Sequence, residues 1–317
     1  FKEFHAIGSV DFSYTLKDGK SHGPFKSYFD SGELYREGSF SEGNLEGERI
    51  TYYRSGEISV KENFEEDLNQ GKYLSYYQDG QLEAEGSFDE GNKVGEWVFY
   101  FENGNKRKVQ NFDENGKENG VEELYTKNGW KLSEHTFNKG VVDSYVFYDE
   151  NGEVISKGKR KGGELEYKSY FENGNLSAEG NYNKTGKHGA WKYYDYNGTL
   201  ETTTQYEDGV SKGTYKDYIV NGNVEIEYEF NDEGDSEGYY QNYYRNGNLY
   251  RQGFLKDGNM DGPWRDYYRN SDLAQEYFYS DNQKEGFHNE YSNNGNQEIA
   301  GYYESGLRKF TIYYDTA

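Results

Sequence analysis

The chain has 317 residues, no cysteine and a formal net charge of −23 at pH 7, and 19% of its residues are aromatic. The lack of cysteine excludes disulfides and thiolate sites, and so many aromatic residues argue against a disordered chain. The acidity disfavours direct binding to nucleic acid or to an anionic membrane, and no apolar run reaches the roughly 20 residues that cross a bilayer.

The N-terminal segment, residues 1–22, does not share the pattern of the rest of the chain. Its stretch VDFSYTL, from Val10 to Leu16, alternates apolar and polar residues as a strand does. We expect one or more N-terminal cap strands here.

From Gly23 onward, one unit recurs at a step of about 24 residues. A tyrosine marks each of its twelve copies: Tyr28, Tyr52, Tyr76, Tyr100, Tyr125, Tyr148, Tyr170, Tyr194, Tyr218, Tyr243, Tyr267 and Tyr291. In most copies a glycine lies five residues before this tyrosine and another lies four residues after it. The unit is G-x-aromatic-x-x-Y-aromatic-x-x-G-x-L, followed by a polar stretch with one more aromatic residue.

Each unit is typical of one β-hairpin. Segments such as FKSYF are rich in aromatic residues and free of proline, and the Asn-Gly and Asp-Gly pairs supply the positive φ of a tight turn. The fold class predicted is all-β: an elongated, single-layer, twisted antiparallel β-meander of about twelve tandem hairpin repeats over residues 23–305. The twelve tyrosines are expected to form a ladder in which each ring packs on its neighbours, with the preceding aromatic on the opposite face.

Two irregularities follow later in the chain. The tyrosine steps shorten around Tyr148, which predicts an irregular hairpin near residues 140–165. The chain ends in KFTIYYDTA, and we expect residues 306–317 to form a C-terminal edge strand.

Three segments carry a family resemblance: GEWVFYFENGN, GAWKYYDYNGTL and GPWRDYYRNSDL. With the 24-residue step, they resemble the MORN repeat, in the variant found in bacterial proteins labelled YwqK-type antitoxin components. The resemblance implies an elongated, twisted sheet that contacts proteins or membranes, although a charge of −23 fits lipid binding badly. A second likeness is to cell-wall-binding repeats, but their step is shorter and this chain has only four tryptophans.

The search for chemistry yields no catalytic, cofactor or metal residue. The five histidines are scattered, and we interpret them as exposed turn residues. No nucleotide-binding motif or nucleophile elbow occurs, and the Asp/Asn/Gly-rich segments are interpreted as hairpin turns. We expect no enzyme activity, no cofactor and no metal.

The sequence therefore favours a non-enzymatic scaffold for protein–protein interaction, as a subunit or accessory protein of a bacterial envelope complex. Candidate partner contacts are the four tryptophans and the central basic run: Trp97, Trp130, Trp191, Trp264, Lys159, Arg160 and Lys161. The alternatives are a glycan- or cell-wall-binding surface protein and an antitoxin- or immunity-type binding protein. Composition and the missing initial Met favour the bacterial cell envelope or surface, with the cytoplasm as the alternative.

Overall fold

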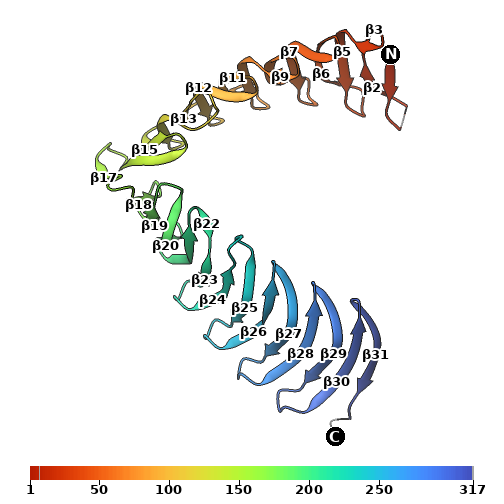
Figure 1. The fold of residues 1–317 in the computed structure, drawn as a ribbon, viewed down its shortest axis with the longest axis vertical. Helices are drawn as coiled ribbons and strands as arrows, with labels where there is room; N and C mark the ends of the chain where they lie inside the picture. Colours follow the sequence, from red (N-terminus) through yellow and green to blue (C-terminus); the bar gives the residue numbers. More distant parts are fainter. Residues whose placement is uncertain (7, 316–317) are drawn as a thin grey trace. The chain divides into compact units, whose positions relative to one another are not determined.

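The computed structural model describes residues 1–6 and 8–315, and every regular element among them is a strand. Residue 7, in the predicted N-terminal cap, and residues 316–317, in the predicted C-terminal strand, lie outside the described residues. The chain divides into two compact units, Phe1–Lys159 and Arg160–Ala317. In each unit the strands lie in one row without a second layer (Figure 1).

The first unit contains one antiparallel sheet, and its short strands β3 and β4 pair separately. Its strands are β1 (Lys2–Phe4), β2 (Val10–Ser13), β3 (Leu16–Lys17), β4 (Lys20–Ser21), β5 (Gly23–Tyr28), β6 (Leu34–Ser41), β7 (Asn44–Tyr52), β8 (Ile58–Glu65), β9 (Leu68–Asn69), β10 (Gly71–Tyr76), β11 (Leu82–Asp89), β12 (Asn92–Tyr100), β13 (Lys106–Phe112), β14 (Gly120–Tyr125), β15 (Lys131–Asn138), β16 (Val141–Tyr148) and β17 (Val154–Lys159).

The second unit repeats this arrangement in a sheet of its own, with β18 and β31 at its two ends. Its strands are β18 (Leu165–Tyr170), β19 (Leu176–Tyr182), β20 (Lys187–Tyr194), β21 (Leu200–Glu207), β22 (Val210–Ser211), β23 (Gly213–Tyr218), β24 (Val224–Phe230), β25 (Ser236–Tyr243), β26 (Leu249–Lys256), β27 (Asn259–Tyr267), β28 (Leu273–Ser280), β29 (Gln283–Tyr291), β30 (Gln297–Glu304) and β31 (Leu307–Tyr313). The predicted all-β meander of tandem hairpins is confirmed.

Two kinds of turn alternate along each sheet. Within the first hairpin, the N–H of Gly32 donates to the carbonyl of Phe29 at 2.9 Å, and only the glycine has a positive φ, of 100°. Between hairpins, Glu42 and Gly43 both have positive φ, as a two-residue type I′ turn requires. The positive φ predicted for Asn-Gly and Asp-Gly pairs is thus confined to the glycine, and the type I′ turns lie at the other end of the strands.

One face of each sheet holds the core. In most hairpins the residue three positions before the marker tyrosine is aromatic, and it packs on this face against the second strand. Phe25 lies 4.8 Å from Phe40, and Trp97 lies 5.0 Å from Phe88 and 5.3 Å from Tyr73, measured between ring centroids. We call this the core face and the opposite one the outer face.

The marker tyrosines lie on the outer face, but their predicted ring-on-ring ladder is wrong. In several hairpins the hydroxyl donates instead to a glutamate fifteen residues earlier, as Tyr100 does to Glu85 at 2.8 Å and Tyr194 does to Glu179 at 2.8 Å. Burial, followed by this hydrogen bond, raises the pKa of Tyr100 and of Tyr194 to about 12. Ring contacts between neighbouring strands run along the core face in both sheets, as Trp97 shows with Phe88 and Trp191 shows with Tyr182.

Candidate functional site

The tryptophans predicted as partner contacts are mostly buried. Trp97 and Trp191 are each 1% exposed and Trp264 is 2% exposed. Each indole covers a glycine of the preceding hairpin, eleven residues earlier: Gly86, Gly180 and Gly253. These three tryptophans are structural, and the prediction that they contact a partner is wrong for the folded chain.

The other predicted contacts are more accessible. Trp130 is half-buried in a hairpin turn, where its carbonyl accepts the N–H of Thr126 at 3.0 Å. Lys159 and Lys161 are exposed, whereas Arg160 is half-buried and donates to the carbonyl of Gly163 at 2.6 Å. Lys159 is the last residue of the first unit, and Arg160 and Lys161 belong to the second.

Two histidines are not the exposed turn residues that we expected. His135 is 5% exposed on β15 and His288 is 6% exposed on β29. Burial lowers the pKa of His135, and it lowers the pKa of His288 to about 4, assisted by the charges of Lys284 and Arg308. Among residues 1–6 and 8–315, no group of three His, Asp or Glu side chains is placed to hold a metal.

An aromatic row runs along the outer face of the last three hairpins. It consists of directly paired residues on neighbouring strands: Tyr239 and Phe254, Pro263 and Phe278, Phe287 and Tyr302, and finally Phe310 opposite Tyr302. Tyr239 and Phe287 are each 61% exposed, and Phe278 is 43% exposed. Tyr302 stacks on Phe310 with centroids 5.7 Å apart. We call these seven residues the outer stripe.

The same positions carry polar pairs earlier in the chain. Glu48 pairs with Asn63, Lys72 with Ser87 and Glu96 with Asn111. The outer stripe is therefore a local departure from the repeat and not a requirement of the fold. Comparing the residue after each repeat glycine across the twelve copies would have revealed it in the sequence.

The residue that follows each marker tyrosine forms a second feature of the repeat. In four hairpins this residue is a tyrosine whose hydroxyl donates to the carbonyl of the next hairpin's marker tyrosine, at 2.6–2.8 Å. The four are Tyr53, Tyr77, Tyr244 and Tyr268. We call them the turn tyrosines, since they connect the turns of successive hairpins.

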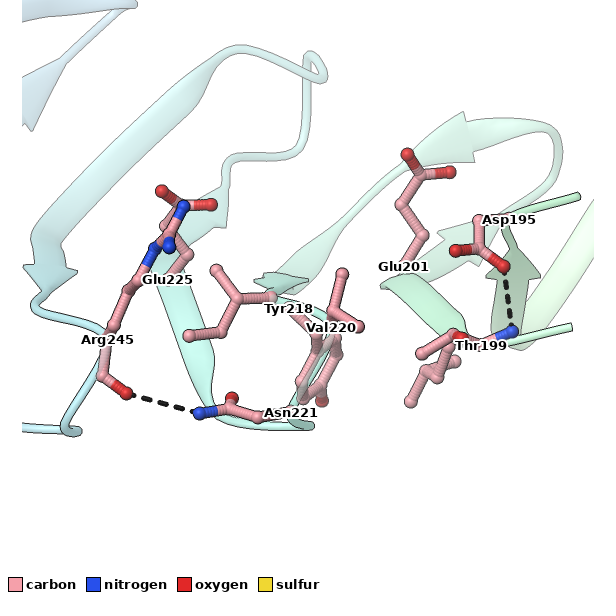
Figure 2. Close-up of a pocket in the computed structure, with 10 residues that line it drawn as sticks. Asp195, Thr199, Glu201, Tyr218, Val220, Asn221, Glu225 and Arg245 are labelled. Atoms are coloured by element: carbon pink, nitrogen blue, oxygen red, sulfur yellow. Dashed lines mark hydrogen bonds between the residues drawn. The ribbon is translucent and has the colours of Figure 1, made fainter. Parts of the chain in front are cut away.

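Two consecutive hairpins of the second unit lack this ring. Asp195 and Ile219 occupy the position, and a hollow of about 530 Å³ lies beside them. In Figure 2, Tyr218, Val220 and Asn221 lie between two groups of lining residues: Asp195, Thr199 and Glu201 on one side, and Glu225 and Arg245 on the other. The hollow lies beside the two positions that turn tyrosines occupy in other hairpins.

Comparison with a protein-family model assigns the repeat. The model of the MORN repeat variant matches residues 21–42, 45–66, 69–90, 93–114, 164–184, 187–208, 236–257 and 260–281, more than half of the chain. The chain belongs to the MORN repeat family. The hairpins between residues 209 and 235, which form part of the hollow, are outside the matched segments.

Comparisons with whole proteins add little to this assignment. None of the curated proteins matches the chain significantly. Two solved structures align with it: the Photorhabdus luminescens Tc holotoxin pore, at 12% identity over 94% of this chain with a TM-score of 0.20, and TcdB2–TccC3 without its hypervariable C-terminal region, at 13% identity over 93% with a TM-score of 0.18. The chain spans 20% of each of those chains, and TM-scores this low support no conclusion about fold or function.

Proposed function

We propose that this MORN-repeat chain is a non-enzymatic protein-binding scaffold whose partner docks on the outer stripe. The observation that carries the proposal is the row of paired, mostly aromatic residues on the outer face of three consecutive hairpins, at positions that carry polar pairs in several earlier hairpins. Phe287, Tyr239 and Phe278 expose 61%, 61% and 43% of their surface. A contiguous exposed apolar patch on a soluble chain marks an interaction surface, and aromatic residues dominate the energy of such surfaces.

The charges beside the stripe indicate the chemistry of the partner. Asp261 pairs with Phe254 across the strands, and Glu285 pairs with Phe278. The partner surface that fits is an apolar strip edged by lysine or arginine. A second copy of this chain is a poor occupant because two chains of charge −23 repel each other.

The test converts the stripe to the pattern of the second hairpin. Phe278→Asn and Phe287→Glu together reproduce the residues found at Asn63 and Glu48, so the fold is expected to tolerate them. The wild-type chain should retain one protein from its native cell in stoichiometric amount, and the double variant should lose it. The matched control, Glu48→Gln with Asn63→Gln, should retain it.

A glycan is the alternative occupant, because exposed rings in a row also stack on sugars. Saturable binding of the wild-type chain to polysaccharide, lost in the double variant while no protein is retained, would replace the protein partner by a glycan. Equal retention of the protein by the wild type and the double variant would refute docking on the stripe.

A further inference from the structure

The hollow in the second unit has the shape of side chains that the chain itself supplies elsewhere. Around Tyr244, a turn tyrosine, three neighbours define the ring's position. Its hydroxyl donates to the carbonyl of Tyr267 at 2.8 Å, its ring lies 5.1 Å from that of Tyr250, and the guanidinium of Arg269 lies 5.7 Å from its centroid.

The corresponding three positions of the repeat surround the hollow, but no ring lies between them. Glu201 follows the hairpin leucine as Tyr250 does, and Val220 occupies the place of Arg269 in the next turn. The carbonyl of Tyr218 corresponds to that of the accepting marker tyrosine, and among the described residues no side chain donates a hydrogen bond to it.

The walls of the hollow are fixed by other contacts. Asp195 is engaged in its own turn, where one carboxylate oxygen accepts the N–H groups of Asn197 and Thr199, each at 2.9 Å. On the far side, the Asn221 side chain donates to the carbonyl of Arg245 at 3.2 Å and joins two successive turns (Figure 2). The hollow is thus held open by the hairpins around it.

The lining combines apolar surface with three carboxylates, of Asp195, Glu201 and Glu225, and one guanidinium, of Arg245, so its net charge is negative. Val220 lies in a turn and is 84% exposed, and Ile219 beside it is half-buried. Glu201 and Glu225 are exposed at the rim. A planar apolar group with a hydroxyl at its tip and a positive charge beside it fits this combination, because the carbonyl accepts, the aliphatic side chains pack and the carboxylates attract a cation.

We propose that the hollow beside Asp195 and Ile219 receives a tyrosine side chain of a partner protein, next to a basic residue of that partner. The inserted phenol donates to the carbonyl of Tyr218, as the chain's own turn tyrosines donate to the corresponding carbonyls. The partner thereby supplies the ring that is missing at the Asp195 position of the repeat. The inference rests on the proposed scaffold function only in taking the occupant to be part of a protein.

The test uses defined probes and the full-length chain. The probes are p-cresol, toluene, and the acetylated amidated tripeptides Ala-Tyr-Lys and Ala-Phe-Lys, at about 5 mM, because one inserted side chain supports a Kd on the order of 1 mM. Methyl NMR follows Val220 and Ile219. We expect shifts at both residues and a preference of about fivefold for each hydroxylated probe, the ratio that one neutral hydrogen bond provides.

Two variants and one control localise the binding. Asp195→Tyr supplies the missing ring from the chain itself and should weaken the Tyr tripeptide at least about tenfold. Val220→Glu changes a residue that is 84% exposed, leaves folding unaffected and should also weaken binding. Ser292→Tyr adds a tyrosine at the same repeat position in the last hairpin, away from the hollow, and should bind as the wild type does.

Other results would overturn the proposal. These are the absence of shifts at Val220 and Ile219, equal binding of toluene and p-cresol, or unchanged binding by Asp195→Tyr. Binding of p-cresol without the tripeptides would assign the hollow to a small phenol and not to a protein. The variant Phe278→Asn with Phe287→Glu should bind the probes normally, so failure of the hollow and failure of the outer stripe are separate results.

Discussion

Replacing Gly86 by alanine should expel a tryptophan from the core. A Cβ atom built on Gly86 lies 2.2 Å from the Trp97 ring, whereas ordinary contacts begin near 3.4 Å. The glycine has no positive φ, so the backbone itself accepts alanine and the effect arises from the side-chain clash alone. Trp97 is 1% exposed, so neighbouring atoms enclose its ring.

The size of the effect follows from the two ways of relieving the clash. Overpacking with the ring in place costs about 1–3 kcal/mol. Full expulsion returns about 200 Å² of apolar surface to water, about 5 kcal/mol at 25 cal/mol per Å², and breaks the hydrogen bond from Trp97 Nε1 to the carbonyl of Ser87, which is 3.1 Å long. Alanine returns about 0.5–1 kcal/mol through lower backbone entropy. We expect a net loss of about 2–4 kcal/mol.

Hydrogen exchange is the appropriate assay, because repeat arrays need not unfold in one step. Protection should fall in β10–β13 and not in distant hairpins, and the tryptophan fluorescence should shift to the red. The matched control is Gly301→Ala, where the nearest atom is 3.6 Å from the new Cβ and the change should stay within about 0.5 kcal/mol. Unchanged protection in Gly86→Ala, or an equal loss in Gly301→Ala, would refute the reasoning. Replacing Trp97 by valine should reduce the penalty of Gly86→Ala.

Three further predictions concern single polar groups. Burial holds the folded-state pKa of His288 at about 4, below the ordinary value of 6.5. The contribution of His288 to stability is therefore complete above pH 6.5 and is lost as the pH falls toward 4. Urea titration should show that the wild type loses about 2 kcal/mol between pH 7 and pH 5 and that His288→Gln does not. Asp266→Asn removes the carboxylate that accepts from Arg251 at 2.6 and 2.7 Å, and since Arg251 is partly exposed we expect a cost of about 2 kcal/mol by the same assay. Tyr53→Phe removes the 2.6 Å hydrogen bond to the carbonyl of Tyr76 and should cost about 1 kcal/mol, measured by hydrogen exchange in the second and third hairpins.

Each of these has its own contrary result. Identical pH profiles for the wild type and His288→Gln would mean that folding does not lower the pKa of His288. Wild-type stability of Asp266→Asn would show that water replaces the carboxylate. Exchange rates that change in Tyr53→Phe only far from the substitution would exclude the role given to the turn tyrosine.

The tryptophan sites show which part of the core can be predicted from the sequence. Trp97, Trp191 and Trp264 each follow a glycine by eleven residues, and this spacing is visible without coordinates. Their exposure was nevertheless mispredicted, because the alternation of a strand says which face a residue occupies but not whether the next hairpin covers that face. In the eleventh hairpin Tyr277 replaces the glycine and His288 follows in place of tryptophan, with ring centroids 5.5 Å apart.

The outer stripe and the hollow also differ in how far the sequence alone reveals them. The outer stripe can be found by comparing repeat positions, since Phe254 and Phe278 stand where Asn63 and Ser87 stand earlier. The hollow cannot, because the loss of a ring at Asp195 leaves an empty volume only if no other side chain moves into it. That depends on how Val220 and the neighbouring turn are held.

The sequence by itself determined the unit, its number, its strands and its turns, because those follow from a local period of aromatic residues and glycines. The tertiary structure decided which aromatic residues are buried, which hydroxyls bind carboxylates instead of stacking, and where the repeat is incomplete. These features arise between hairpins. The space that a glycine leaves is filled by a side chain eleven residues later, and the ring of a turn tyrosine contacts a turn about one repeat later.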